Sequence, residues 1–447
     1  MQMPATLLPY ALLLTGLLLM SNCKGRKDWL AGAVTIALLA WTLLESVWTI
    51  VMTLRDGLGT YSYPFTINGS FQSPAPFGAL NAIGLAVALA TLVTLRKESG
   101  WPARFQRCLA WAVLVPASLV LLVSRSRAAW VGLLVSLLLL LLRETGLKGW
   151  MRRHRVVAAS AALIILVAGA GMYALKKDSA IGRFHLWHME CRAIAAHPWT
   201  GVGFDHIFKA YGDAQSAYFQ QAERPAVFVR VADSPVYAFN EYLKFGMAWG
   251  IGGFLLSAAV AAYVVWRLFR KRSVLAYGAL VYALFAFASF PLSVVQLKLL
   301  GTVLLAVALA PDGKRHPWWL QVVWGIAFCA CVAAAIYAYP EEKTRRAAER
   351  EWRASLLMEL DTEEALALLQ PLYDYLKDNS TYLYHYGYLL RQSGAYEASN
   401  RILQQGAERS CDPVFHTTMA QNYLDLGLPE LADAERQVAH WLIPSRY

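Results

Sequence analysis

Long apolar runs alternate with short polar loops from the start of the chain to about residue 340. Roughly ten of these runs come close to the ~20 residues that a helix needs to cross a bilayer. We expect spanning helices at residues 4–20, 29–52, 78–95, 105–123, 127–142, 156–175, 236–265, 274–291, 293–310 and 317–339. The pattern therefore predicts an all-α, polytopic membrane protein.

Lysine and arginine gather in alternate loops, and this predicts the orientation of the helices. The basic loops lie at residues 24–27, 96–107, 143–155, 267–272 and 314–315. Loops of this kind are retained on the cytoplasmic side. The complementary segments should then face outward: residues 53–77, 124–130, 176–235, a turn near Pro291 and everything after 340.

Composition agrees with this picture and excludes other classes. Apolar residues make up 57% of the 447 and charged residues 16%, with a mean hydropathy of +0.39. The net charge of +11 lies in short loops between apolar runs, where it sets topology, so we expect no nucleic-acid partner. The six cysteines show no paired metal-ligand spacing, so we expect no metal site.

One outward edge carries two arginines, Arg125 and Arg127, between two apolar runs. A lone arginine at such an edge is usually a headgroup anchor. Two arginines with serines beside them are more typical of an anion clamp, because guanidinium groups bind phosphate bidentately and stay charged. The positive charge also opposes the topology rule on this side, which favours a functional role.

Two further regions face outward. Residues 176–235 form a long loop, rich in Trp, His and Arg, in which residues 181–196 should be helical and 201–203 should make a tight turn. We therefore divide the chain into a membrane domain at 1–340, which contains this loop, and an outer domain at 341–447.

The outer domain is charged and helical. Gly387 and Ala420, Leu390 and Tyr423, and Gly394 and Gly427 are spaced by 33 residues each, which resembles tetratricopeptide helix pairs. Pro371 should kink or shorten the preceding helix. Such repeats either bind a protein partner or serve as a stabilising cap.

Four motifs together resemble the O-antigen ligase superfamily over about residues 60 to 310. These are Gly69–Pro74, Ser126–Trp130, His197–Gly203, and Phe239–Leu243 followed by Gly250 and Gly253. The superfamily includes O-antigen ligases, polymerases and protein O-oligosaccharyltransferases. The resemblance implies transfer of a glycan from an undecaprenyl diphosphate carrier to an acceptor hydroxyl, at the periplasmic face of the bacterial inner membrane, without metal, nucleotide or other cofactor.

The resemblance also implies residue roles. Arg127 and Arg183 match the arginines that grip the carrier diphosphate. Many members have a histidine, proposed as the general base, at the position where this chain has Phe239. The resemblance therefore does not identify the general base of this chain. Glu241 is our first choice, and the alternatives are His185, His188, His197, Asp205 and His206. The further substrate-binding candidates are Arg125, which is either part of the clamp or an anchor, and Ser126, Trp130, Trp187, His197, Gly201, Gly203 and Asn240.

The sequence leaves the acceptor undetermined and allows two other functions. Lipid A core, a growing glycan or a protein could each be the acceptor, and the sequence does not separate them. A transporter of polyprenyl-linked sugars should show internal repeats with broken helices, and the sequence shows none. A membrane-anchored scaffold that recruits partners through its repeats would not require Arg127 or Arg183. Membrane lipid is an expected partner whether the protein is a transferase, a transporter or a scaffold.

Overall fold

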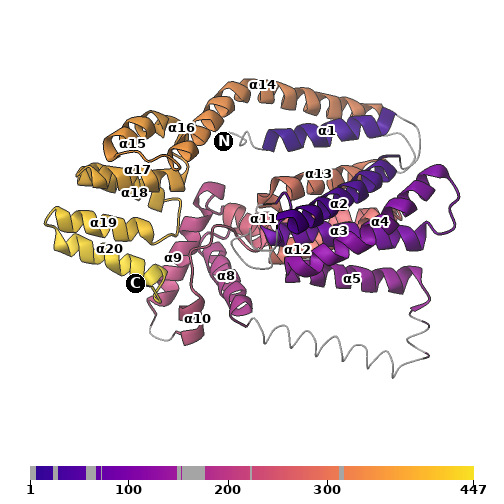
Figure 1. Ribbon diagram of the computed structural model, residues 1–447, viewed down its shortest axis with the longest axis horizontal. Helices are drawn as coiled ribbons and strands as arrows, with labels where there is room; N and C mark the ends of the chain where they lie inside the picture. The colour runs from indigo at the N-terminus through magenta and orange to yellow at the C-terminus, as the bar shows by residue number, and fades with distance from the viewer. Residues whose placement is uncertain are drawn as a thin grey trace. The chain divides into compact units, whose positions relative to one another are not determined.

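The computed structural model describes residues 7–23, 29–56, 67–71, 73–147, 149, 153, 177–221, 224–311 and 317–446. Every regular element in these residues is a helix, which confirms the all-α prediction (Figure 1). Each predicted span within them coincides with a helix, whereas the span predicted at 156–175 lies outside the described residues.

The chain forms two compact units. Unit 1 comprises residues 1–169, 239–241 and 258–335, and unit 2 comprises residues 170–238, 242–257 and 336–447. Unit 1 contains α1 (Leu8–Cys23), α2 (Trp29–Asp56), α3 (Pro74–Thr94), α4 (Trp101–Ser124), α5 (Arg127–Glu144), α12 (Leu275–Ala288), η3 (Pro291–Ser293) and α13 (Val295–Leu309). Two helices, α11 (Glu241–Arg270) and α14 (Trp318–Ser355), contribute to both units.

Unit 2 contains the remaining helices. They are α8 (Lys177–Ala196), η2 (Phe204–His206), α9 (Ile207–Phe219), α10 (Ala226–Val231), α15 (Thr362–Leu369), η4 (Gln370–Leu372), α16 (Tyr373–Leu376), α17 (Ser380–Gln392), α18 (Tyr396–Ala407), α19 (Val414–Asp425) and α20 (Pro429–Leu442).

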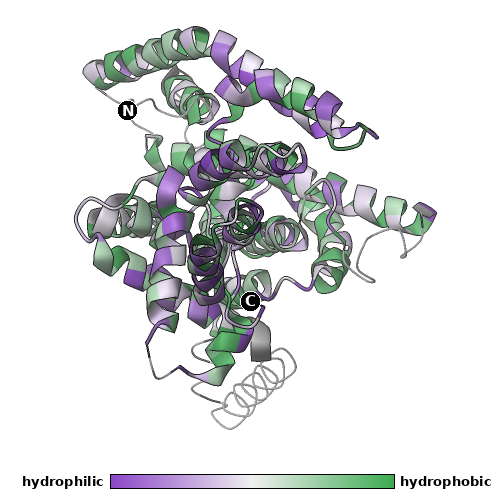
Figure 2. Ribbon diagram, turned by 90° about the vertical axis from the view of Figure 1, so that its left-hand side faces the viewer, coloured by the Kyte–Doolittle hydropathy of each residue, from purple (hydrophilic) through white to green (hydrophobic). Residues whose placement is uncertain are grey.

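Apolar helices dominate unit 1. Within the described residues, α2, α3, α4, α11 and α14 are long and apolar enough to cross a membrane, while α1, α12 and α13 are shorter apolar helices. These helices indicate a membrane protein, and the full count of ten spans stays a prediction. Figure 2 shows that α14 is apolar over its first part and charged over its last part, as its sequence dictates.

Helix α3 forms the centre of unit 1, packed against α2, α4, α5 and α12. Leu80 and Ile83 are fully buried. Lipid tails are as apolar as the helix surface, so close backbone approach must replace the hydrophobic drive for packing. Gly84 provides it, since a Cβ there would lie 2.4 Å from Thr42 Oγ1 on α2.

The C-terminal part of unit 2 is built from helix pairs, α17 with α18 and α19 with α20. Gly394 and Gly427 lie in the turns of the two pairs with φ of +80° and +73°, where the sequence places them. The helix before these pairs is interrupted at Pro371, which lies in η4 between α15 and α16, as its missing N–H predicts. Their assignment to the tetratricopeptide class stays a prediction.

Candidate functional site

The two arginines lie in a sharp turn between α4 and α5. Arg125 adopts a left-handed conformation with φ of +52° and is exposed, and Arg127, half-buried, is the first residue of α5. A cation at a helix N-terminus opposes the helix dipole, at a cost of about 0.3–1 kcal/mol. An anion bound there would instead meet both the guanidinium group and the positive helix end.

This turn is fixed against its neighbours by buried contacts. The Ser126 hydroxyl donates to the Ala75 carbonyl on α3 at 3.1 Å, and a Cβ on Gly78 would lie 2.5 Å from Ser126 Cβ. The Trp130 indole donates to the Leu121 carbonyl at 3.0 Å. Ser126 and Trp130, both predicted to bind substrate, therefore hold the turn that carries Arg127.

The Gly69–Pro74 element lies beside the start of α3. Gly69 has φ of +58°, and a Cβ there would lie 2.6 Å from the ring of Phe77. The Ser70 hydroxyl donates to Glu45 Oε1 of α2 at 2.5 Å, and the Ser70 carbonyl accepts from Gln296 of α13 at 3.3 Å. Ser70 thus ties this element to two helices at the same end of unit 1.

Glu241 begins α11 and is 2% exposed. Its Oε1 accepts a hydrogen bond of 2.7 Å from the backbone N–H of Leu292 in η3. Asn240 is buried beside it, and Phe239 packs edge-on against Phe290, with ring centroids 5.3 Å apart. Phe239 therefore has a packing role, and the Glu241 carboxylate joins the start of α11 to the turn between α12 and α13.

These segments gather at one end of unit 1. Ser126 is hydrogen-bonded to Ala75 in the first turn of α3. Ser70, which lies just before α3, is hydrogen-bonded to Gln296 of α13. Leu292, which lies just before α13, is hydrogen-bonded to Glu241. Three motifs that are far apart in the sequence are thus linked by these hydrogen bonds and by the short chain segment from Leu292 to Gln296. These contacts place the arginine turn and Glu241 at the same end of unit 1.

Arg183 and Trp187 lie on α8 in unit 2, and both are half-buried. Trp187 packs edge-on against Phe184, with ring centroids 5.7 Å apart. His185, the next residue after Phe184, is fully buried among aromatic rings that include Phe219 and Phe228. Burial lowers the pKa of His185, so this imidazole is neutral near pH 7.

A buried glutamine, Gln215 of α9, connects α8 to the C-terminus. Its Oε1 accepts from Tyr211 Oη at 2.7 Å and from His185 Nε2 at 2.9 Å. Its Nε2 donates to the carbonyls of Leu442 at 2.7 Å and Asp233 at 3.2 Å. One side chain therefore satisfies partners from α8, α9, the loop before α11 and the end of α20. His185, an alternative base, is committed to this network.

Gln215→Leu should destabilise unit 2 by about 3 kcal/mol or more, because it leaves several buried polar groups unsatisfied at roughly 1–3 kcal/mol each. Thermal unfolding of the purified full-length protein measures the effect. Gln220→Leu is the matched control, because Gln220 is exposed and its side chain donates to the Ser216 hydroxyl at 3.2 Å. Equal melting temperatures for the two variants would show that the network is not a structural link.

The His197–Gly203 motif docks onto a break in α11. Trp249 and Gly250 leave helical geometry, and Gly250 has φ of +68°. Two N–H groups of the motif, those of Val202 and Gly203, donate to the carbonyls of Met247 and Ala248 at 2.9 Å each.

In return, the Ile251 N–H donates to the Pro198 carbonyl at 2.7 Å. Gly201 is required by this docking, since a Cβ there would lie 2.4 Å from the Ala248 carbonyl carbon, whereas Gly203 has a positive φ of +78°. Gly201 and Gly203 therefore shape the loop through their backbones.

The other candidate bases lie in unit 2. His188 is exposed and packs edge-on against Tyr218, and His206 Nδ1 lies 3.0 Å from the Glu408 carbonyl oxygen. Asp205 and His197 are both exposed. Among the described residues, no group of three or more His, Cys, Asp or Glu side chains is arranged to hold a metal ion.

The middle of the chain is similar to a known family. Residues 112–258 match the family model described as O-Antigen ligase. A comparison with curated proteins gives no match. The matched stretch includes the arginine turn, α8, the glycine turn at 201–203 and the break in α11, and it excludes the Gly69–Pro74 element and the C-terminal helix pairs. Residues 112–258 of this membrane protein are therefore similar to the O-antigen ligases, a family of the glycosyltransferase type.

Proposed function

We propose that this protein transfers a glycan from an undecaprenyl diphosphate carrier to an acceptor hydroxyl at the periplasmic face of the inner membrane. The acceptor oxygen attacks the anomeric carbon, the bond from that carbon to the phosphate oxygen breaks, and the diphosphate leaves with the electron pair. The hydroxyl proton passes to a base. The acceptor is lipid A core, as for a ligase, or a growing glycan or a protein.

The observation that carries this proposal is the rigid arginine turn inside the family match. Arg127 presents a permanent charge at the start of α5, in a turn held by Ser126 and Trp130. Fixed cations that meet charge as it develops on a leaving group are a large catalytic term. Arg183 on α8 supplies a second cation for the same diphosphate, by resemblance to the family.

Glu241 is the proposed base on the acceptor side. It lies at the same end of unit 1 as the arginine turn, and its Oε1 is held by the Leu292 N–H. That hydrogen bond fixes the orientation of the carboxylate, which a general base requires before its substrate arrives. Asn240, His197 and Trp187 are proposed to contact the sugars, and Arg125 the lipid headgroup or the diphosphate.

Deletion of the gene should remove one glycan product and leave the carrier-linked donor to accumulate on the periplasmic side. The missing product identifies the acceptor: glycan on lipid A core, long glycan chains, or glycan on proteins. Accumulation on the cytoplasmic side would contradict a transferase and support a transporter. Loss of a protein complex with all glycans intact would support a scaffold.

A further inference from the structure

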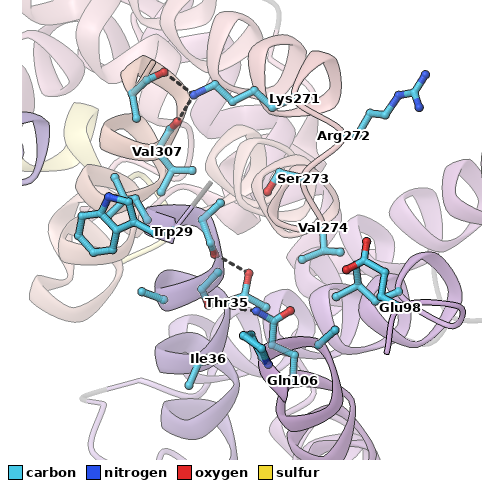
Figure 3. Close-up of a pocket in the computed structure, with 18 of the residues that line it drawn as sticks. Trp29, Thr35, Ile36, Glu98, Gln106, Lys271, Arg272, Ser273, Val274 and Val307 are labelled. Carbon is cyan, nitrogen blue, oxygen red and sulfur yellow. Dashed lines mark hydrogen bonds between the residues drawn. The ribbon is translucent and has the colours of Figure 1, made fainter. Parts of the chain in front are cut away.

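A cavity of about 640 Å³ lies at the opposite end of unit 1 from the arginine turn (Figure 3). It is lined by the first residues of α2 and α4, the turn between α11 and α12, and the end of α13. Trp101 and Gln106, near the start of α4, line it, whereas Arg125 follows the other end of the same helix. Its size falls in the range of about 300–1,000 Å³ that is typical of ligand pockets.

The buried side chain of Gln106 faces this cavity. Gln106 is only 6% exposed, and its Nε2 donates to the Gly32 carbonyl at 3.3 Å. Its Oε1 makes no hydrogen bond to any residue that the structure describes. Figure 3 shows the amide directed towards the part of the cavity lined by Thr35 and Val274. This carbonyl oxygen is accessible within the cavity, where it can accept a hydrogen bond from a ligand.

Two exposed charges of opposite sign lie on the rim. The carboxylate of Glu98 and the guanidinium of Arg272 form no ion pair or side-chain hydrogen bond within the described ranges, and Figure 3 shows them apart. The third charged residue of the lining, Lys271, has partners within the protein. Its Nζ donates to the carbonyls of Val307 and Ala310 at the end of α13. Among the described residues, the rim therefore offers the Glu98 carboxylate and the Arg272 guanidinium to a ligand.

Tryptophans on the rim of the cavity favour a position at the level of the lipid headgroups. Trp29 and Trp101 are on its rim, and tryptophan is enriched where a membrane protein meets the interface. Trp101 is 72% exposed and stacks on Phe105. Deeper walls are apolar and include Ile36 and Val307. A ligand with a polar head and an acyl chain matches both parts of this lining.

We propose that this cavity binds a phospholipid whose headgroup carries a primary ammonium, as phosphatidylethanolamine does. The ammonium donates to Gln106 Oε1 and pairs with Glu98, the phosphate meets Arg272, and an acyl chain lies along the apolar wall. A choline headgroup has the positive charge but no N–H donor for Gln106. A glycerol headgroup has donors but no cation for Glu98. The site thus selects among lipids by hydrogen-bond donor and charge together.

Competitive lipid retention tests this proposal. The full-length protein, purified in detergent and stripped of lipid, is mixed with equal amounts of phosphatidylethanolamine, phosphatidylcholine and phosphatidylglycerol, and bound lipid is counted by native mass spectrometry. We expect phosphatidylethanolamine to be retained about tenfold over either competitor, the ratio that one extra hydrogen bond of about 1.4 kcal/mol provides. Equal retention of all three lipids, or preference for phosphatidylglycerol, would overturn the assignment.

Variants locate the site. Gln106→Leu and Glu98→Gln should each abolish the preference, and because Glu98 is exposed, its variant tests the proposal even where the buried change at Gln106 impairs folding. Lys97→Ala is the matched control, an exposed charge in the same loop that does not line the cavity. A preference that survives in Glu98→Gln and in a folded Gln106→Leu would place the lipid elsewhere.

Discussion

Arg127→Lys should lower glycan transfer by about a hundredfold, the loss typical of removing one transition-state contact of about 3 kcal/mol. Lysine keeps the charge but not the planar fork that binds two phosphate oxygens at once. The turn itself should survive, because Ser126 and Trp130 hold it. Accumulation of carrier-linked glycan in cells, at matched protein level, measures the loss.

Two other arginines serve as controls for this variant. Arg143→Lys changes the same residue type at the far end of α5, where its guanidinium group lies 4.9 Å from the ring of Phe269, so transfer should be unchanged. Arg125→Ala should have a milder effect if that side chain anchors in the headgroups. Arg183→Ala should match the loss at Arg127. Full activity in both Arg127→Ala and Arg183→Ala would refute the transferase mechanism.

The apolar helices of this protein are readable from its sequence, because a long apolar run is enough to predict each of them. The predicted runs and observed helices agree within the described residues, and Pro371, Gly394 and Gly427 interrupt the chain where their backbone chemistry requires. The arginine turn is likewise visible as a charged break between two apolar runs. These features depend on local sequence, which propensity and hydropathy capture.

The contacts that support the site are not readable in this way. Gln215 belongs to no motif, yet its side chain bonds both to His185 of α8 and to Leu442. Leu442 lies 227 positions beyond Gln215 in the chain. Nothing local distinguishes a buried glutamine from an exposed one such as Gln220. The grouping of the outer loop with the C-terminal helices in unit 2 arises from such long-range contacts. The contact between Ser126 and Ala75 is hidden for the same reason.

The break in α11 is the clearest case of a backbone requirement behind a motif. Sequence similarity marks Gly201, Gly203 and Gly250 as part of two separate motifs, without giving a reason for glycine. In the structure, the two motifs form one docked pair of segments, joined by reciprocal backbone hydrogen bonds. Glycine is required at Gly201 and Gly250 because each approaches the backbone of the other segment more closely than a Cβ allows, and at Gly203 because of its positive φ.

A graded series of alanine substitutions should follow from this geometry. Gly252→Ala meets no atom within 4 Å and lies in α11, so stability should be unchanged or slightly raised. Gly203→Ala also has room for its Cβ, but with φ of +78° and ψ of 158° its backbone should cost about 1–3 kcal/mol.

Gly250→Ala should be the most damaging member of the series, because strain and overlap act together. Its φ of +68° carries the same backbone cost as Gly203, and its Cβ would lie 2.3 Å from the Pro198 oxygen, which accepts the Ile251 hydrogen bond. Overpacking adds about 1–3 kcal/mol, so the total approaches the roughly 5–15 kcal/mol that stabilises a folded domain. Limited proteolysis near residue 200 measures how far this segment separates from α11. Accumulation of carrier-linked glycan in cells measures the accompanying loss of transfer. Equal protease resistance in Gly250→Ala and Gly252→Ala would show that the docked segments do not depend on this close approach.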